Sequence, residues 1–265
     1  EILSGLVGSE MCIRDRGYRI LLLSDLHGRR FGKENKRLLR RIEKEKPDAV
    51  AVTGDMLDRS VLDCGVFLRL AETLCKRYPV YYAVGNHELY LQPQRLKDFL
   101  ARLRSYGVHI LDNRSAVLEK DGSRIFLYGL WCPLEYYKET RGVAGHPRFG
   151  PEQMRAVLGT CRRDGYTVLL AHNPISFDAY AAWGADLTLS GHVHGGMVRL
   201  PFLGGLLSPE RSFFPEYCAG LYGKGAQKLL VSRGLGSGVF SLRVGNRPEL
   251  VTVTLARPGE PEKGT

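Results

Sequence analysis

Five short apolar segments of this chain each lead directly into side chains of the types that bind metals, and this pattern constrains the fold most. The polar residues that follow the five segments are Asp25 and His27, then Asp55 and Asp58, then Asn86, His87 and Glu88, then His172 and Asn173, and finally His192 and His194. Open α/β sheets place their binding sites at the carboxyl ends of strands. We therefore expect these side chains to meet at one edge of a sheet structure.

Strands and helices alternate in the first half of the chain, which predicts a largely parallel α/β layer. Apolar runs predict strands at 18–23, 48–53, 79–84, 166–171 and 186–189, with short strands within 108–130 and near 218–222, 227–232 and 249–255. Helical spacing predicts helices at 33–46, 61–77, 93–104 and 151–163. Residues 131–149 are expected to form a long irregular loop.

Residues 1–16 differ from the rest of the chain. They have no helical or strand period and no signal-peptide layout, and LVGSEMCIRDR resembles a conceptually translated sequencing adapter. We predict that this segment is not native, so that the true N-terminus and any anchor it carries are missing. The remainder is interpreted as one domain over residues 17–257, followed by a flexible tail over 258–265.

The charge of the chain favours anionic partners. It has 38 Lys and Arg against 28 Asp and Glu, a formal net charge of +10. Phosphate esters, nucleic acids and acidic lipid surfaces all suit such a charge. The 44% hydrophobic content argues against disorder, and no apolar run reaches the ~18–20 residues of a membrane-spanning helix.

The ordered motifs D-x-H, G-D-x-x-D, G-N-H-E, H and G-H-x-H resemble those of the calcineurin-like metallophosphoesterase superfamily. The segments 189–196, 232–236 and 247–250 are similar to its YkuE/YaeI-like bacterial subgroup. This resemblance implies a four-layer α/β/β/α sandwich of two mixed β-sheets flanked by helices. One departure is Met197, which stands where the subgroup usually has Gln.

The resemblance also implies a pair of divalent metal ions, and the ligand types suit Mn, Fe or Zn. Carried over motif by motif, the ligands of the first metal are Asp25, His27, Asp55 and His194. Those of the second are Asp55, Asn86, His172 and His192, with Asp55 as the bridge. Two such metals activate a hydroxide for attack at phosphorus.

Further roles are expected around this centre. His87 is placed to bind a phosphoryl oxygen or protonate the leaving group, with Glu88 or Asp58 to orient it; the alternative is a structural His in a turn. Arg59, Trp131 and Tyr136 are predicted substrate contacts, although Arg59 equally suits a surface salt bridge. The apolar loops 131–137 and 197–215 would hold acyl chains, or else pack together as a small core.

We therefore expect a phosphodiester or pyrophosphate hydrolase acting on an envelope lipid or a nucleotide-lipid precursor resembling UDP-diacylglucosamine. The alternatives are a soluble nucleotide phosphodiesterase or nuclease, and a non-catalytic scaffold. Peripheral contact with an anionic membrane, a monomeric state and no nucleic-acid partner are expected. The expected location is the bacterial cell envelope or a membrane, with the cytoplasm as the alternative.

Overall fold

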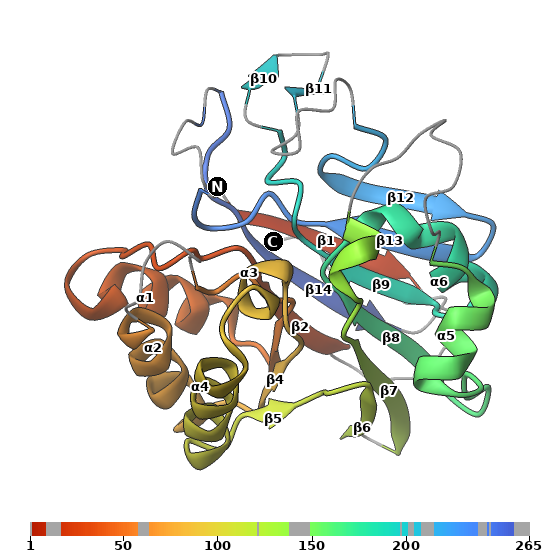
Figure 1. Ribbon diagram of the computed structural model, residues 1–265, viewed down its shortest axis with the longest axis horizontal. Helices are drawn as coiled ribbons and strands as arrows, with labels where there is room; N and C mark the ends of the chain where they lie inside the picture. Colours follow the sequence, from red (N-terminus) through yellow and green to blue (C-terminus); the bar gives the residue numbers. More distant parts are fainter. Residues whose placement is uncertain are drawn as a thin grey trace.

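The computed structural model describes residues 17–57, 64–120, 122–137, 149–196, 215–237, 243 and 245–256, and the backbone alone of residues 2–8, 198–200 and 204–207. Two six-stranded β-sheets form the centre of this structure, and helices lie on both sides of them (Figure 1). The α/β/β/α sandwich predicted from the sequence is confirmed.

The first sheet has the strand order β1–β14–β2–β3–β4–β5. Its strands are β1 (Ile2–Gly8), β2 (Tyr18–Leu23), β3 (Ala49–Val52), β4 (Val80–Tyr82), β5 (His109–Ile110) and β14 (Leu250–Ala256). Strands β2 to β5 run parallel, whereas β14 is antiparallel to β2. The parallel strands therefore end at the same edge, which is where the chain turns at Asp25 and Asp55.

The second sheet has the order β12–β13–β9–β8–β7–β6. Its strands are β6 (Arg114–Lys120), β7 (Ser123–Leu130), β8 (Tyr166–Ala171), β9 (Leu187–Ser190), β12 (Gly220–Lys224) and β13 (Gln227–Val231). Strands β7, β8, β9 and β13 are parallel, and antiparallel strands β6 and β12 form the two edges. A separate two-stranded ribbon joins β10 (Val198–Leu200) to β11 (Gly204–Leu207).

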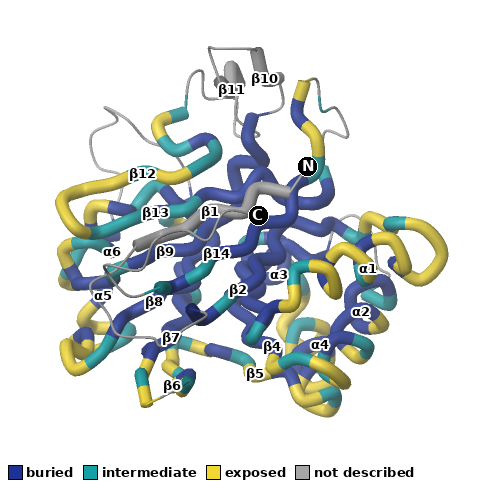
Figure 2. The backbone as a smooth tube through the Cα atoms, turned by 180° about the vertical axis from the view of Figure 1, so that it is seen from behind, coloured by how far each residue is buried: buried dark blue, intermediate teal, exposed yellow. Residues whose placement is uncertain are grey.

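Alternation along the strands divides the apolar side chains between three layers of core. In β2, Ile20 and Leu22 face the second sheet, while Leu21 and Leu23 face the helices on the outside. The outer helices of the first sheet are α1 (Lys36–Glu45), α2 (Gly65–Cys75) and α4 (Pro93–Ser105). Those of the second sheet are α5 (Pro151–Leu158) and α6 (Phe177–Trp183). The central strands are accordingly buried, and exposed residues gather on the helices, the loops and the edge strands β6 and β12 (Figure 2).

Two helices were not expected from the sequence. Helix α6 has seven residues and α3 (Asn86–Leu89) has four, too few to display a helical period. Helix α5 ends at Leu158, five residues before the predicted end, because Gly159 has a φ of 71° and leaves the helical region.

The segment predicted to be translated adapter has a strand within it. Residues 2–8 pair in parallel with the free edge of β14. Backbone hydrogen bonds to an open sheet edge require no particular side chains. This pairing therefore does not test whether the segment is native, and its non-native origin stays a prediction. Among the described residues, no helix combines the length and apolarity needed to cross a bilayer.

Candidate metal centre

The side chains singled out in the sequence lie where the strands of the two sheets end. Asp25 and His27 follow β2, Asp55 follows β3, and Asn86 and His87 begin α3 after β4. His172 follows β8 of the second sheet, and His192 and His194 follow β9. Since the sheets pack face to face, these strand ends bring the residues together into two adjoining groups.

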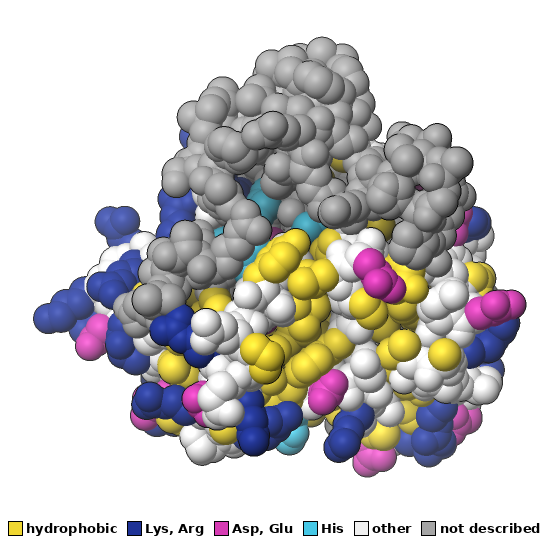
Figure 3. Space-filling model, in the orientation of Figure 1, with side chains coloured by type: hydrophobic (Ala, Val, Ile, Leu, Met, Phe, Trp, Pro, Cys, Tyr) yellow, Lys and Arg dark blue, Asp and Glu magenta, His cyan; other side chains and the backbone are white. Residues whose placement is uncertain are grey.

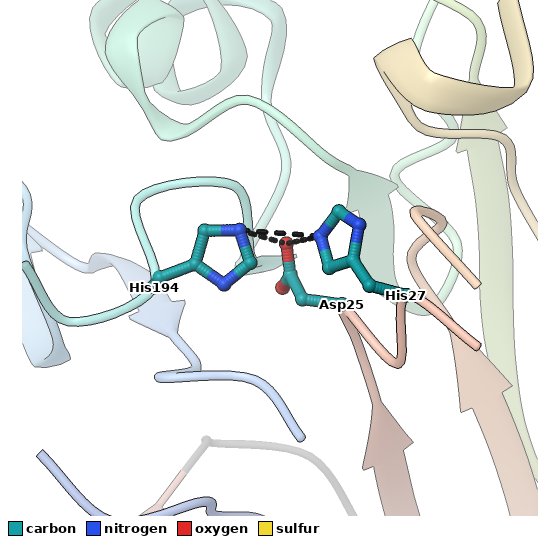
Figure 4. Close-up of side chains that lie close together, drawn as sticks. All are labelled: Asp25, His27 and His194. Carbon is teal, nitrogen blue, oxygen red and sulfur yellow. Dashed lines mark hydrogen bonds and ion pairs between the residues drawn. The ribbon is translucent and has the colours of Figure 1, made fainter. Parts of the chain in front are cut away.

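The first group consists of Asp25, His27 and His194, which point toward one another (Figure 4). The Nε2 atoms of the two imidazoles are 3.2 Å apart. The Oδ1 atom of Asp25 lies 4.0 Å from Nε2 of His27 and 3.6 Å from Nε2 of His194. All three residues are buried, so their potential ligand atoms converge in a space away from bulk water.

The second group consists of Asp55, His172 and His192. Nδ1 of His172 lies 2.8 Å from the carbonyl oxygen of Thr53, and a carbonyl can only accept, so Nδ1 carries the proton. Nε2 of a neutral His172 therefore presents a lone pair to Oδ2 of Asp55, 3.1 Å away. The same Oδ2 atom is 3.8 Å from Nε2 of His27, which places the Asp55 carboxylate between the groups.

These residues fit divalent cations. Two acceptors at the His172–Asp55 distance repel each other unless a proton or a cation lies between them. The buried Oδ1 atom of Asn86 receives no hydrogen bond from the described residues, which leaves an amide oxygen available as a ligand. Carboxylate, imidazole and amide donors together suit borderline to hard divalent metals.

The electrostatics of the centre favour ionised carboxylates. Burial opposes ionisation, but neighbouring histidines, His194 for Asp25 and His172 for Asp55, lower the pKa of each carboxyl below its ordinary value. Burial likewise opposes protonation of His172, yet the Asp55 carboxylate raises its pKa to about 9. Burial lowers the pKa of His194 to about 3, with His27 and Arg243 adding to the effect.

The backbone is strained where the expected ligands stand. Positive φ angles occur at Asp25 (53°), His27 (46°), Asp55 (53°), His192 (71°) and His194 (53°). A residue with a side chain rarely adopts this region, and such residues cluster at functional sites because the surrounding structure must enforce them. The strain indicates that the fold is used to aim these side chains.

Glu88 provides one of the supports. Its Oε2 atom accepts hydrogen bonds from the backbone N–H groups of Asp55 and Gly85, both at 2.8 Å. Its Oε1 atom accepts from those of Met56 at 2.8 Å and Leu57 at 3.1 Å. The fully buried carboxylate thus ties the loop after β3 to the turn that begins α3. The predicted role of Glu88 or Asp58 in orienting His87 stays a prediction.

His87 lies beside both groups. Its backbone N–H donates to Oδ1 of Asp55 at 2.8 Å, and its ring meets that of His27 edge-on with centroids 4.5 Å apart. The side chain is buried and lies within ligand distance of His27 and Asp55. Asp58 and Arg59, predicted to act next to it, are outside the described residues.

The two predicted aromatic contacts differ in their surroundings. Trp131 is half-buried against the outer core of the first sheet, and Tyr136 packs its ring edge-on against Phe149, centroids 5.1 Å apart. It is the next residue, Tyr137, whose buried ring approaches His192, with centroids 5.2 Å apart. The sequence predicted an irregular loop here, but residues Leu134–Tyr137 form a 3₁₀ helix, and so short an element has no period by which to choose between adjacent tyrosines.

Arg243 and Asn246 were also missed in the sequence. Asn246 holds the His194 turn through bonds from Nδ2 to the carbonyl oxygens of His194 (2.5 Å) and Gly196 (2.7 Å). Nη2 of Arg243 donates to the carbonyl oxygen of Arg233 at 2.8 Å and lies 3.4 Å from Nδ1 of His194. Burial lowers the pKa of Arg243 to about 10. Neither residue belongs to a helix or strand, and both are far along the chain from His194.

Comparisons with known proteins agree with this geometry. Residues 18–196 match the family model described as calcineurin-like phosphoesterase. Phosphodiesterase YaeI of Escherichia coli is 28% identical over 246 residues, which are 90% of this chain and 82% of that protein. The Bacillus subtilis metallophosphoesterase YkuE is 26% identical over 90% of this chain and 79% of its own. The family resemblance noted in the sequence is thereby confirmed.

Two further comparisons concern length and fold. The metallophosphoesterase Cj0846 of Campylobacter jejuni is 30% identical over 89% of this chain, but the match spans only 59% of that longer protein. The solved structure of a phosphopantetheinyl hydrolase from Mycobacterium tuberculosis superposes with a TM-score of 0.54 at 13% identity, covering 82% of this chain and 89% of that one. The chain belongs to the calcineurin-like phosphoesterases, metal-dependent hydrolases of phosphoric esters that use two divalent metal ions.

Proposed function

We propose that this protein is a phosphodiesterase or pyrophosphatase that acts on an envelope lipid or a nucleotide-lipid precursor. The observation that supports the site is the meeting of the two groups at Asp55. One metal would be held by Asp25, His27, Asp55 and His194, and the other by Asp55, Asn86, His172 and His192. Manganese, iron and zinc all suit this donor set. When bound, such ions supply Lewis acidity and lower the pKa of water.

The protein side chains would then position the substrate. His87 lies close enough to both groups to donate a hydrogen bond to a phosphoryl oxygen or a proton to the leaving oxygen. Tyr137 closes one wall of the centre and excludes water beside His192. The backbone strain and the Glu88 tie preserve this arrangement before substrate arrives, so little reorganisation is needed.

The lipid part of the proposal draws on the sequence. The net charge of +10 favours a phosphate-bearing substrate, and the stretch 197–215 is rich in Leu and Phe. In that stretch only the backbone of residues 198–200 and 204–207 and residue 215 are described. The relative YaeI is named a phosphodiesterase, which supports diester rather than monoester chemistry.

The test compares bis-p-nitrophenyl phosphate with p-nitrophenyl phosphate as substrates of the full chain. The protein would be stripped of metal and then supplied with Mn²⁺, beside Asp55→Asn. Asp48→Asn is the matched control, because Asp48 accepts bonds from the backbone N–H of Arg19 and from Lys120, outside the proposed metal site. We expect turnover of the diester that needs metal and is lost only in Asp55→Asn.

A second stage addresses the substrate class. UDP-diacylglucosamine, a nucleotide diphosphate sugar without acyl chains, and duplex DNA would be offered to the Mn²⁺-loaded protein. Preference for the acylated substrate supports the lipid proposal. Equal cleavage of the sugar nucleotide without acyl chains, or preference for DNA, would favour a soluble nucleotide phosphodiesterase or nuclease instead. Failure to bind metal at all would contradict the proposed centre.

A further inference from the structure

A groove of about 430 Å³ runs along helix α1 at the side of the molecule. One wall of this groove, which we call the α1 groove, carries Arg37, Arg40, Arg41 and Lys44. Their spacing places them on one face of α1, along about 10 Å of helix. Figure 3 shows Lys and Arg side chains gathered at the edge where α1 lies in Figure 1.

The four basic side chains are exposed. Within the described part of the chain, none of them forms an ion pair with an acidic side chain, whereas the two Glu residues of α1 are engaged elsewhere. Glu43 pairs with Arg77, and Glu45 with Arg19. The helix therefore presents positive charge alone on the face that borders the groove.

The opposite wall adds apolar surface but no exposed negative charge. It includes Leu235, Pro248 and Leu250, and Phe31 also lines the groove. Glu249 also lines it, but this residue is only 2% exposed, and its carboxylate accepts bonds from the backbone N–H and Nη2 of Arg233. The α1 groove thus joins a row of cations to a strip of apolar side chains.

We propose that the α1 groove docks the protein on an anionic phospholipid bilayer. Clustered Lys and Arg side chains attract anionic headgroups, and one guanidinium group can donate two parallel hydrogen bonds to a phosphate. The apolar wall would contact the glycerol and ester region beneath a headgroup. A free phosphate would leave this wall without a contact. Nucleic acid fits less well, because the guanidinium of Arg29 lies 5.3 Å from the centre of the Phe31 ring and occupies a face on which a base would stack.

The groove adjoins the metal centre through the backbone. The N–H of Leu235 donates to the carbonyl oxygen of Ser24 at 3.0 Å, and that of Gly236 to the carbonyl oxygen of Asp25 at 2.5 Å. A bilayer held at α1 would thus lie beside the strand end that carries Asp25. Only this consequence, access to a substrate still in the membrane, rests on the proposed function; docking itself does not.

The test is binding to vesicles without turnover. The full chain would be sedimented with vesicles of phosphatidylcholine alone and of phosphatidylcholine with phosphatidylglycerol, at low and physiological salt. Arg40→Glu with Arg41→Glu is the groove variant. Arg102→Glu with Arg104→Glu is the matched control, because these exposed arginines on α4 give the same change in charge outside the groove. Thermal unfolding verifies that both variants are folded.

We expect binding to the anionic vesicles that falls at least about tenfold in the groove variant and at most about twofold in the control. Equal losses in the two variants would overturn the proposal, since net charge rather than the groove would then be responsible. No binding of the unaltered chain to anionic vesicles, or complete displacement from them by duplex DNA or glycerol phosphate, would overturn it too. If the unaltered chain binds the anionic vesicles as expected but does not hydrolyse the diester, only the proposed function is contradicted.

Discussion

Glu88→Gln tests whether the buried carboxylate of Glu88 acts as a tie between loops or orients His87. The amide keeps the size of the side chain but replaces one carboxylate oxygen with an NH₂ group. That group would face two backbone N–H donors, either those of Asp55 and Gly85 or those of Met56 and Leu57. Two of the four hydrogen bonds are therefore lost, and the new NH₂ group, itself a donor, lies against two backbone N–H donors.

The expected cost follows from these bonds. A hydrogen bond to a charged group contributes about 1.5–3 kcal/mol, so two lost bonds amount to about 3–6 kcal/mol. Removing a buried charge offsets part of this loss, because burial raises the pKa of Glu88 and so opposes its ionisation. We expect the free energy of unfolding to fall by about 3 kcal/mol, which lowers Tm by roughly 6–12 °C in a chain of this size.

The effect on metal binding separates the two roles. If Glu88 is a tie, the displaced Asp55 weakens Mn²⁺ affinity by about 10–100-fold, and saturating Mn²⁺ restores most of the activity. Urea denaturation of the metal-free protein gives the first quantity, and calorimetric titration with Mn²⁺ gives the second. Unchanged stability and unchanged Mn²⁺ affinity, combined with low activity at saturating metal, would refute the tie and favour the orienting role.

Three further variants address the packing around the centre. Gly54→Ala should cost more than about 3 kcal/mol of stability in thermal unfolding, because a Cβ at this φ of 100° would lie 2.0 Å from the backbone nitrogen of Gly85; a variant as stable as the parent would contradict that contact. Arg243→Gln should weaken Mn²⁺ binding about 10-fold by calorimetry, because it removes the contact of the guanidinium with the His194 ring, and unchanged affinity would count against a role for this contact. Tyr137→Phe should change the free energy of unfolding by less than about 0.5 kcal/mol in urea, because the buried hydroxyl has no hydrogen-bond partner among the described residues; a larger loss would reveal such a partner.

Much of the candidate site could be predicted because each of these residues follows an apolar run that is visible in the local sequence. An apolar run followed by Asp55 or His172 is a strand end with a polar group, whatever the rest of the chain does. Parallel strands then bring such ends to the same edge. The order of the motifs further identified the family, and with it the four-layer fold that the structure has.

The parts that were missed depend on contacts between segments distant in sequence. Arg243 contacts His194, which lies 49 positions earlier in the chain, and nothing in the local sequence around Arg243 signals that partner. That the ring of Tyr137 approaches His192 depends on the 3₁₀ helix Leu134–Tyr137, which is too short to show a period in the sequence. The role of Glu88 depends on four backbone N–H groups whose directions are set by the turns that hold them.

The sequence by itself therefore determined the strands that lead to the candidate ligands, the chemical types at their ends and the family, since period and local motif are properties of neighbouring residues. Only the tertiary structure decided which atoms meet at what distance, where the backbone is strained, and that four cations without an ion pair among the described residues border an apolar groove beside the centre. Those features arise when separate strand ends and loops pack together, and packing is a property of the whole chain.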